Sequence, residues 1–555
     1  MTTYCFAVEL AIYDENQNVP GERWLRFATD GFTTSAMCTP PNTYYEGRLE
    51  QALWIPRAMF AEGTTYGRSV ATPGDLILAN ADAALDDLIT AGFDGRRVIV
   101  RRGVKGAMYP DEWETVFVGT MEHPDFTPTS LVIRLRSLQY DLENAVLTSR
   151  YAGTNTNGNG VEGVTTDIRG QLKPRVLGDV LNIAPPAVNT ARLVYQLSDS
   201  PVAVVHAVYD RGVALSLGAP YASLAECLAV SPPPSTARLY SGTEGAFIRL
   251  GSSPAGTVTV DASETLDPTD ATIGQLFARA LTRAGTARGD ASLYTLRAGD
   301  LALADAQAPG PCGRWVTDDV SWASLFDEMA ETLGGWWGFD AQGAVRFAQI
   351  AKPRGTPVRT ITSDDFTPPL ERLHTNDPAS DLPVYEYRIR YAQNYTVQPA
   401  TSLAGSVDEA TRVARAQAFR EVARTNAGVQ PKHPLAVSIA STTWLQQLED
   451  AEHEAMRRLN LRSRLRHIFE LRVPLTDEFV ALELGDIVGL LVNRYSLQLV
   501  GDEIGRLFYV TGIAPDANRE LIRLTLWGSG FDTRNRITEA GALRVDETAA
   551  YRTTE

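Results

Sequence analysis

The sequence predicts a mainly β fold with α+β parts, divided among several domains. Short segments that alternate apolar and polar residues, separated by turn residues, occur near both ends of the chain, as in antiparallel sandwiches or barrels. Near the middle, a helical pattern ends in two glycines and continues as an aromatic strand. The chain has 555 residues. A chain of this length does not fold around a single hydrophobic core, so roughly three to five domains are expected.

The first domain is predicted over residues 1–150. Alternating patterns indicate strands at 4–13, 24–27, 48–54, 76–79, 98–102, 114–118 and 131–136. A short helix is expected at 84–91, shortly before the turn Asp94-Gly95-Arg96. A basic cluster begins at this turn and comprises Arg96, Arg97, Arg101, Arg102 and Lys105. The cluster fits either contact with an acidic neighbouring subunit or a strand edge that charge protects from aggregation.

A β-rich insert is predicted over residues 151–262, beginning with a polar, glycine-rich run at 151–160. Its strands are expected at 193–196, 201–213, 247–251 and 255–261. His206 lies within one of these apolar patterns, and no other His, Cys or carboxylate is spaced to complete a metal site with it. We therefore interpret His206 as a hydrogen-bonded core residue.

The stretch 325–347 is the centre of the predicted organisation, within an α+β domain over residues 263–372. Apolar residues recur at helical spacing at Leu325, Phe326, Met329 and Leu333. Gly334 and Gly335 end this helix, since glycine reaches positive φ without penalty. Trp336 and Trp337 then read as a buried strand, followed by a turn at 340–343 and a returning strand. No nucleophile or metal-ligand set accompanies them, which favours a packing unit over a ligand pocket.

The last folded domain is predicted over residues 373–530. A strand is expected at 383–391 and helices at 407–425 and 442–462, followed by strands at 469–474, 484–492, 507–513 and 521–527. Residues 531–555 read as a polar tail. The largest basic run comprises Arg457, Arg458, Arg462, Arg464, Arg466 and Arg472. We interpret it as a helix and strand neutralised by acids of neighbouring subunits, in preference to a nucleic-acid site.

Composition and motifs argue against several classes of protein. The net charge of −16 is unlike that of proteins held on nucleic acid by phosphate contacts. Four cysteines without CxxC spacing indicate neither a disulfide framework nor a zinc or iron–sulfur site. His453-Glu454 lacks the second histidine of a metalloprotease helix. No signal peptide or membrane span is predicted, and no nucleotide-binding or nucleophile motif points to an enzyme or cofactor.

Further motifs follow one another along the chain. They are Asp94-Gly95-Arg96 with F-x-G at 117–119, K-P-x-x-x-G at 173–178, V-x-x-V-Y-D-x-G-V at 205–213, G-x-V-T-V-D at 256–261, the Gly334-Gly335-Trp336-Trp337 unit, L-x-x-G-D-x-V with Gly485 and Asp486, and L-T-L-W-G with Trp527. In this order they resemble the baseplate hub or tail-tip proteins of long non-contractile-tailed bacteriophages and related gene transfer agents.

This resemblance implies tail-tube-like β-barrels for the first and last domains. It implies a structural, non-enzymatic protein that assembles in the bacterial cytoplasm and resides in the virion tail tip. Three copies would place six barrels in a ring, which joins a six-fold tail to a three-fold central fibre and encloses the DNA exit channel. The implied partners are the distal tail protein, the tape-measure protein and the central fibre or receptor-binding proteins. DNA would pass without specific binding.

The residues expected to serve packing and assembly are those of the motifs: Asp94, Gly95, Arg96, Gly334, Gly335, Trp336, Trp337, Gly485, Asp486 and Trp527. Two other functions remain open from the sequence. One is a six-copy distal tail ring protein with one ring barrel per chain. The other is a carbohydrate-binding receptor module in which tryptophans stack on sugars, the candidates being Trp336, Trp337, Trp444 and Trp527.

Overall fold

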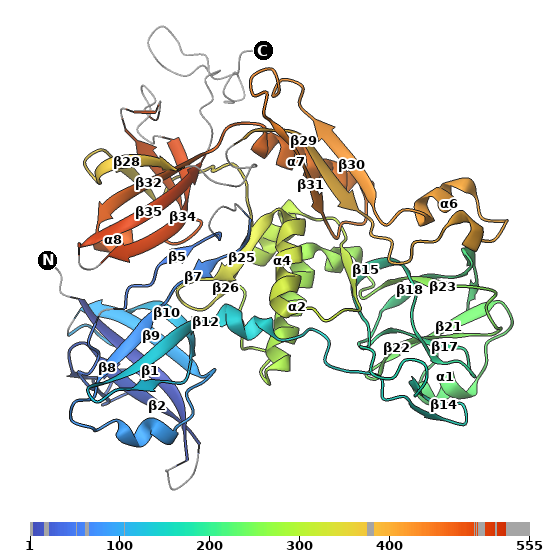
Figure 1. Ribbon diagram of the computed structural model, residues 1–555, viewed down its shortest axis with the longest axis horizontal. Helices are drawn as coiled ribbons and strands as arrows, with labels where there is room; N and C mark the ends of the chain where they lie inside the picture. The colour runs from blue at the N-terminus through green and yellow to red at the C-terminus, as the bar shows by residue number, and fades with distance from the viewer. Residues whose placement is uncertain are drawn as a thin grey trace.

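Figure 1 shows the protein as a computed structural model with four parts: an N-terminal barrel, a C-terminal half-barrel, a central α+β body and an insert sandwich. The central body lies between the insert sandwich and the two barrels (Figure 1). The prediction of a mainly β fold with α+β parts is confirmed. The described residues are 4–15, 21–51, 53–61, 66–104, 106–373, 382–492, 494–495, 497, 506–516 and 519–528. Lys105 and the expected tail at 531–555 lie outside them.

The N-terminal barrel has the strand order β11-β12-β10-β9-β1-β2, with β8 beside β12. Its strands are β1 (Tyr4–Asp14), β2 (Gly21–Ala28), β8 (Asp75–Ala79), β9 (Arg97–Val104), β10 (Glu114–Met121), β11 (Asp125–Phe126) and β12 (Ser130–Ser137). Residues 46–50, part of an expected strand, close the sheet. The Ala28 N–H donates to the Glu46 carbonyl on one side, and the Glu50 N–H donates to the Ile77 carbonyl on the other. The predicted helix at 84–91 is a shorter 3₁₀ turn, η1 (Asp86–Thr90).

The insert sandwich packs two five-stranded sheets, β19-β18-β23-β15-β24 and β16-β17-β22-β21-β20, around one apolar core. Its strands are β15 (Arg175–Ile183), β16 (Ala187–Asn189), β17 (Val194–Ser198), β18 (Val204–Asp210), β19 (Val213–Ala214), β20 (Ser216–Leu217), β21 (Thr236–Gly242), β22 (Gly245–Leu250), β23 (Val258–Ser263) and β24 (Gly313–Val316). Beside it lie the hairpin β13 (Thr154–Thr156) and β14 (Asn159–Val164), and helix α1 (Leu224–Ala229).

The central body packs helices against two small sheets. The first part contains α2 (Ile273–Ala287), α3 (Asp300–Gln307), α4 (Trp322–Leu333), β25 (Gly335–Phe339) and β26 (Val345–Gln349). The second part is the three-stranded sheet β30-β29-β31 with α7 packed on it, formed by β29 (Val384–Tyr391), β30 (Arg420–Thr425), β31 (Val437–Thr442) and α7 (Leu448–Arg462). One apolar core runs through both parts.

The C-terminal half-barrel is a curled sheet of order β27-β33-β34-β35-β32-β28. Its elements are β27 (Arg359–Thr362), β28 (Thr367–Leu373), β32 (His467–Pro474), α8 (Asp477–Val480), β33 (Ile487–Leu491), β34 (Arg506–Asp516) and β35 (Leu521–Gly528). The two outermost strands, β27 and β28, are neighbours in the sequence and are joined by residues 363–366. This short connection brings the two ends of the sheet toward each other and gives the sheet its curl.

Two predicted helices are wrong in extent. The helix expected at 407–425 is only α6 (Glu409–Arg415), and the remainder contains strand β30, which pairs along its whole length with β29. The helix expected at 442–462 begins at Leu448, because the backbone carbonyls of Trp444 and Leu445 accept hydrogen bonds from other segments. In both places pairing with distant backbone outweighs the local preference of Ala, Arg and Leu for helix.

His206 is also placed differently from the prediction. It lies on β18 with its side chain half exposed, and its Nε2 is 3.5 Å from the Asp179 carboxylate. Strand β18 is covered on one face only, since Val205 and Val208 are buried while His206 is exposed. The apolar neighbours in the sequence therefore belong to the opposite face and to a bulge at 205–207.

Candidate functional site

The four-residue unit at 334–337 lies where the central body meets both barrels, and we call this region the barrel junction. Strand β25 pairs with β26 on one side and, in parallel, with the short strand β6 (Gly67–Arg68) on the other. Successive side chains of a strand point to opposite faces. Trp336 therefore enters the core of the C-terminal half-barrel, and Trp337 enters the core of the central body.

Trp337 is fully buried and contacts three groups, two from helix α4 and one from strand β6. Its ring lies edge-on to Phe326 of α4, with 5.3 Å between ring centroids. Its indole N–H donates to the Asp327 carboxylate at 2.7 Å. The Arg68 guanidinium lies 5.7 Å from the ring centroid and donates to the same carboxylate at 2.6 Å. Burial of an aromatic ring with a satisfied polar edge makes this residue a strong anchor.

Trp336 is 4% exposed and belongs to the apolar core that also contains Trp527. Gly485 lies directly against the Trp336 ring, because a Cβ at that position would be 3.5 Å from the ring. The Arg346 guanidinium lies 5.7 Å from the ring centroid and donates to Asp300 at 2.8 Å. Three of the sequence-predicted residues, Trp336, Gly485 and Trp527, thus come together at one side of the junction.

Gly334 and Gly335 have different roles in this region. Gly334 ends helix α4 with φ of 67°, in the left-handed region that glycine occupies freely. Gly335 begins strand β25, and a Cβ there would lie 2.0 Å from the Ala348 carbonyl oxygen of β26. The backbone of the neighbouring strand thus leaves no space for a side chain at Gly335.

Gly335→Val is expected to lower the free energy of unfolding by about 3 kcal/mol, since the β25–β26 pair must separate to admit the side chain. Gly21→Val is the matched control, because Gly21 is also a strand residue and nothing lies within 4 Å of its Cβ position. Chemical denaturation of both variants measures the difference. Equal stability of the two variants would refute the close packing at Gly335.

A buried ionic cluster covers the C-terminal end of α4. Glu454 on α7 accepts hydrogen bonds from Arg457 at 2.6 Å and from Arg458 at 2.5 Å. Arg458 also donates to the Glu331 and Thr332 carbonyls in the last turn of α4, where the Glu331 carbonyl accepts from the Gly334 N–H as well. Carbonyls in the last turn of a helix need such partners from outside the helix. Burial by itself raises the pKa of Glu454, but the positive charges of Arg458 and Arg457 outweigh it and lower the pKa overall.

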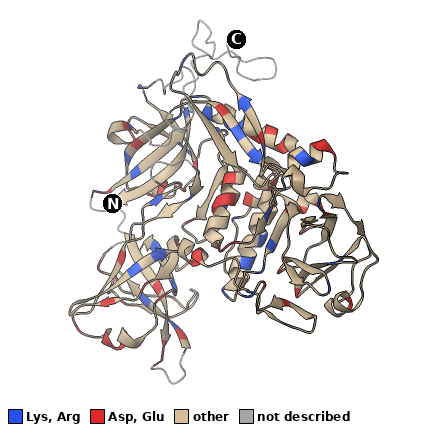
Figure 2. Ribbon diagram, turned by 45° about the vertical axis from the view of Figure 1, so that its right-hand side comes forward, with Lys and Arg blue, Asp and Glu red and all other residues tan. Residues whose placement is uncertain are grey.

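This cluster corrects the interpretation of the basic run at 457–472 for two of its residues, since Arg457 and Arg458 are neutralised within the chain by Glu454. Three arginines of the N-terminal basic cluster are likewise paired internally. Arg96 bonds Glu22, Arg101 bonds Glu9, and Arg102 bonds Glu114. Figure 2 shows Lys and Arg interspersed with Asp and Glu along the ribbon. Internal ion pairs therefore account for these five arginines, and contact of the other basic residues of the two runs with a neighbouring subunit stays a prediction.

The segment 56–72, of which residues 56–61 and 66–72 are described, reaches the barrel junction from the N-terminal barrel, and no pattern in the sequence predicts this. Its strands β5 (Arg57–Ala58) and β7 (Val70–Ala71) pair with each other, and β5 pairs with β34 of the half-barrel. The Met59 N–H donates to the Thr511 carbonyl, and the Ser69 N–H donates to the Trp337 carbonyl. This one segment thus connects the N-terminal barrel to the half-barrel and to the central body, and Figure 1 shows its strands β5 and β7 between these parts.

The Arg57–Glu483 pair fixes this segment to the half-barrel through two parallel bonds of 2.8 and 3.0 Å. A double-mutant cycle with Arg57→Met and Glu483→Gln is expected to give a coupling energy of about 1 kcal/mol, because a bidentate and mostly buried pair exceeds an exposed one. The exposed Arg519–Asp516 pair, separated by 3.6 Å, is the control and should couple by a few tenths of a kcal/mol at most. Equal coupling in the two cycles would contradict this ranking.

The remaining predicted residues lie as follows. Asp94, Gly95 and Arg96 form a turn at one end of the N-terminal barrel, where the Gly95 N–H and the Arg96 carbonyl bond Met121. Gly95 has φ of 70° there. Asp486 precedes β33, and its carboxylate accepts a hydrogen bond from the Glu483 N–H at 2.8 Å. The structure thus brings Gly334 to Trp337, Gly485, Asp486 and Trp527 into one region and leaves 94–96 apart from it.

The tryptophans considered for sugar stacking are all in the core. Trp336, Trp444 and Trp527 are 4% exposed and Trp337 is 0% exposed. A sugar ring needs an accessible aromatic face to stack on. The carbohydrate-binding function, as formulated on these four residues, is therefore wrong.

Few features of the described residues suit a metal or cofactor. In this part of the chain no group of three or more His, Cys, Asp or Glu side chains is placed to hold a metal ion. All four cysteines are free and buried. Among the described helices, none has the length and apolar character needed to cross a membrane.

Comparison with known proteins gives matches among solved structures only: no family model and no curated protein matches the chain. A chain of the virion of a native gene transfer agent particle has 12% identity and a TM-score of 0.40, with 71% of this chain and 92% of that chain covered. The tail protein from Neisseria meningitidis MC58 has 8% identity and a TM-score of 0.39, with 94% and 97% covered.

The 43 kDa tail protein of prophage MuSo2 from Shewanella oneidensis has 8% identity and a TM-score of 0.37, with 87% of this chain and 94% of that chain covered. The solved structures that this chain is similar to are thus phage tail proteins and a gene transfer agent virion chain.

Proposed function

We propose that this chain is a structural protein of a phage-like tail, and specifically the baseplate hub at the tail tip. The observation that carries the proposal is the barrel junction. One chain contains two barrel-like sheets, and β25, β6 and the segment 56–72 hold them in a fixed relation through paired backbone and two apolar cores. A ring-building subunit with two ring positions needs such a fixed spacing.

Open strand edges support assembly with further copies. Strand β2 pairs with β1, and on its outer side the residues 21–25 have no strand partner within the described chain. At the half-barrel, β27 pairs only with β33 and β28 only with β32 among the described strands. Unpaired edges promote pairing with another chain, and a ring satisfies every edge by closed symmetry. Three copies would contribute six barrels.

In this proposal the chain has no catalytic role and lies at the distal end of the tail, after assembly in the host cytoplasm. The distal tail protein and the tape-measure protein would bind above it and the central fibre below it. DNA would leave through the enclosed channel without specific binding. The net charge of −16 supports a channel wall that repels the phosphate backbone. A six-copy distal ring is less well supported, because each chain of that ring contributes one barrel and this chain contains two barrel-like sheets.

Complementation tests this function. In a particle-producing strain that lacks the chain, electron microscopy should show no complete tails. The wild-type chain should restore them, and so should Gly405→Val, because nothing lies within 4 Å of the Cβ position of Gly405 and this residue is outside the proposed edges. Gly335→Val and Asp486→Pro should fail. Asp486→Pro removes the backbone N–H that bonds the Glu483 carbonyl and the carboxylate that bonds the Glu483 N–H. Normal tails in the strain that lacks the chain would exclude a structural role in the tail.

A further inference from the structure

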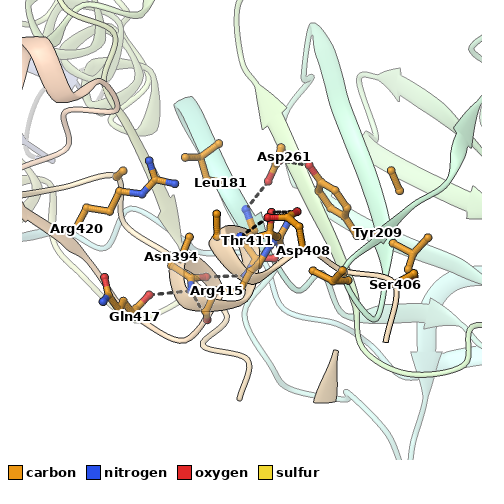
Figure 3. A pocket seen from close by; sticks show the side chains of 18 residues that line it. Leu181, Tyr209, Asp261, Asn394, Ser406, Asp408, Thr411, Arg415, Gln417 and Arg420 are labelled. Carbon is orange, nitrogen blue, oxygen red and sulfur yellow. Dashed lines mark hydrogen bonds between the residues drawn. The ribbon is translucent and has the colours of Figure 1, made fainter. Parts of the chain in front are cut away.

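A large cleft lies away from the barrel junction, between the insert sandwich and the segment that carries α6. Its volume is about 790 Å³, within the range of roughly 300–1,000 Å³ found for ligand sites. Strands β15, β18 and β23 form one wall, and the segments 392–394 and 406–420 form the other (Figure 3). None of the packing residues predicted from the sequence lines it.

The wall from the insert sandwich carries a fixed polar array. The Asp261 carboxylate accepts hydrogen bonds from the Tyr209 hydroxyl at 2.8 Å and from the Asn182 N–H at 2.7 Å. Burial and the neighbouring Asp261 charge raise the pKa of Tyr209 to about 12, so its hydroxyl stays protonated. The Arg415 guanidinium from the opposite wall lies 4.3 Å from the Tyr209 ring centroid. These side chains are held before any ligand arrives, which lowers the entropy cost of binding.

The opposite wall is anchored to the first by side-chain amides. The Asn182 amide donates to the Asn394 side-chain oxygen at 2.6 Å, and the Asn394 amide donates to the Arg415 and Gln417 carbonyls at 2.9 Å each. Beyond these anchors, three lining side chains have no hydrogen bond within the described residues: Ser406, Gln417 and Arg420. Figure 3 shows all three labelled around the cleft. All three are exposed, so they are available to a ligand.

The lining defines the class of ligand. Two carboxylates, Asp261 and Asp408, are balanced by two guanidinium groups, Arg415 and Arg420, so the cleft has no net preference for an anion or a cation. Its remaining polar side chains are amides and hydroxyls, which together donate and accept, and apolar side chains such as Leu181 and Val407 lie beside them. A sugar hydroxyl also donates and accepts at once, and neighbouring hydroxyls match the paired atoms of carboxylate, amide and guanidinium groups.

We propose that this cleft binds a neutral oligosaccharide. Asp261 and Arg415 form the floor, and Gln417 and Arg420 bind hydroxyls at the mouth. The site differs from the tryptophan stacking excluded above in both its residues and its position. The proposal is independent of the hub function, because it concerns the insert sandwich and the α6 segment and involves no residue of the barrel junction.

Isothermal titration of the full chain with lactose, maltose, cellobiose and chitobiose tests the proposal, with 3′-sialyllactose as the anionic probe. At least one neutral disaccharide should bind. The double variant Gln417→Ala/Arg420→Ala should weaken that binding about tenfold or more, since it removes hydrogen bonds to a charged and an amide group. Arg134→Ala is the control, because Arg134 has a side chain 67% exposed on the N-terminal barrel.

Both substituted side chains at the mouth are exposed, so the double variant should unfold at the wild-type temperature. Tyr209→Phe is a second test, because it removes a hydroxyl group at the floor of the cleft. This variant should weaken binding of the disaccharide while the chain stays folded. The proposal is overturned if no neutral disaccharide binds, if sialyllactose binds more tightly than lactose, or if Gln417→Ala/Arg420→Ala binds as well as Arg134→Ala.

Discussion

Trp337→Ala is expected to lower the free energy of unfolding by about 3–5 kcal/mol, the range for removing a large buried aromatic side chain. The loss has three parts: the cavity beside Phe326, the lost indole hydrogen bond to Asp327, whose carboxylate keeps its bonds from Arg68, and the lost contact of the ring with Arg68. Trp337→Phe keeps the apolar volume in part and should cost less. Chemical denaturation of the full chain measures both variants.

Trp336→Ala should cost a similar amount but in a different part of the molecule. Because Trp336 belongs to the half-barrel core and Trp337 to the central core, hydrogen exchange should separate the two variants. Trp336→Ala should speed exchange in β32, β34 and β35, and Trp337→Ala should speed it in α2, α4 and β26. Identical exchange patterns would contradict the assignment of the two neighbours to different cores.

Glu454→Gln is expected to destabilise the protein by about 3–5 kcal/mol, because it leaves the buried Arg458 charge without its partner. Arg458 is 4% exposed and Glu454 is 7% exposed, so water replaces little of the lost interaction. Glu452→Gln on the same helix is the matched control. Glu452 pairs with Arg424 at the surface, with side chains 40% and 31% exposed, and its loss should cost less than about 1 kcal/mol.

The same glutamate gives a pH dependence with a defined sign. The pKa of Glu454 is lowered in the folded protein from its ordinary 4.5. Its contribution to the free energy of unfolding is therefore complete above pH 4.5. It is lost as the pH falls below 4.5 and through the folded-state pKa. The stability difference between wild type and Glu454→Gln should therefore be constant near neutral pH and shrink in acid. A difference that grows on acidification would reverse the sign of the assigned shift.

Local patterns predicted the centre of the fold well. The α4–β25–β26 unit, its terminating glycines and the burial of Trp336 and Trp337 all follow from helical spacing and glycine conformations that lie within a few residues of one another. Most barrel strands were also predicted, because apolar residues alternate along several of them; β12, for example, buries Leu131, Ile133 and Leu135. The division into domains at 150, 262, 372 and 530 stays a prediction.

Interactions between distant segments were not predictable in this way. Strands β5, β6 and β7 have two residues each, too few for any periodicity, and β5 and β6 pair with β34 and β25, which lie hundreds of residues away. The Glu454 cluster was missed for another reason. Glutamate and arginine at i, i+3 and i+4 on a helix are typical of a solvent-exposed face, and only the packing of α7 over the end of α4 makes them buried.

The most direct measurement is the number of copies of this chain in the tail tip, obtained by electron cryomicroscopy of intact particles. The account predicts three copies around the tail axis, each contributing its N-terminal barrel and its C-terminal half-barrel to one ring of six. Six copies that contribute one barrel each, or a chain absent from the ring, would contradict it.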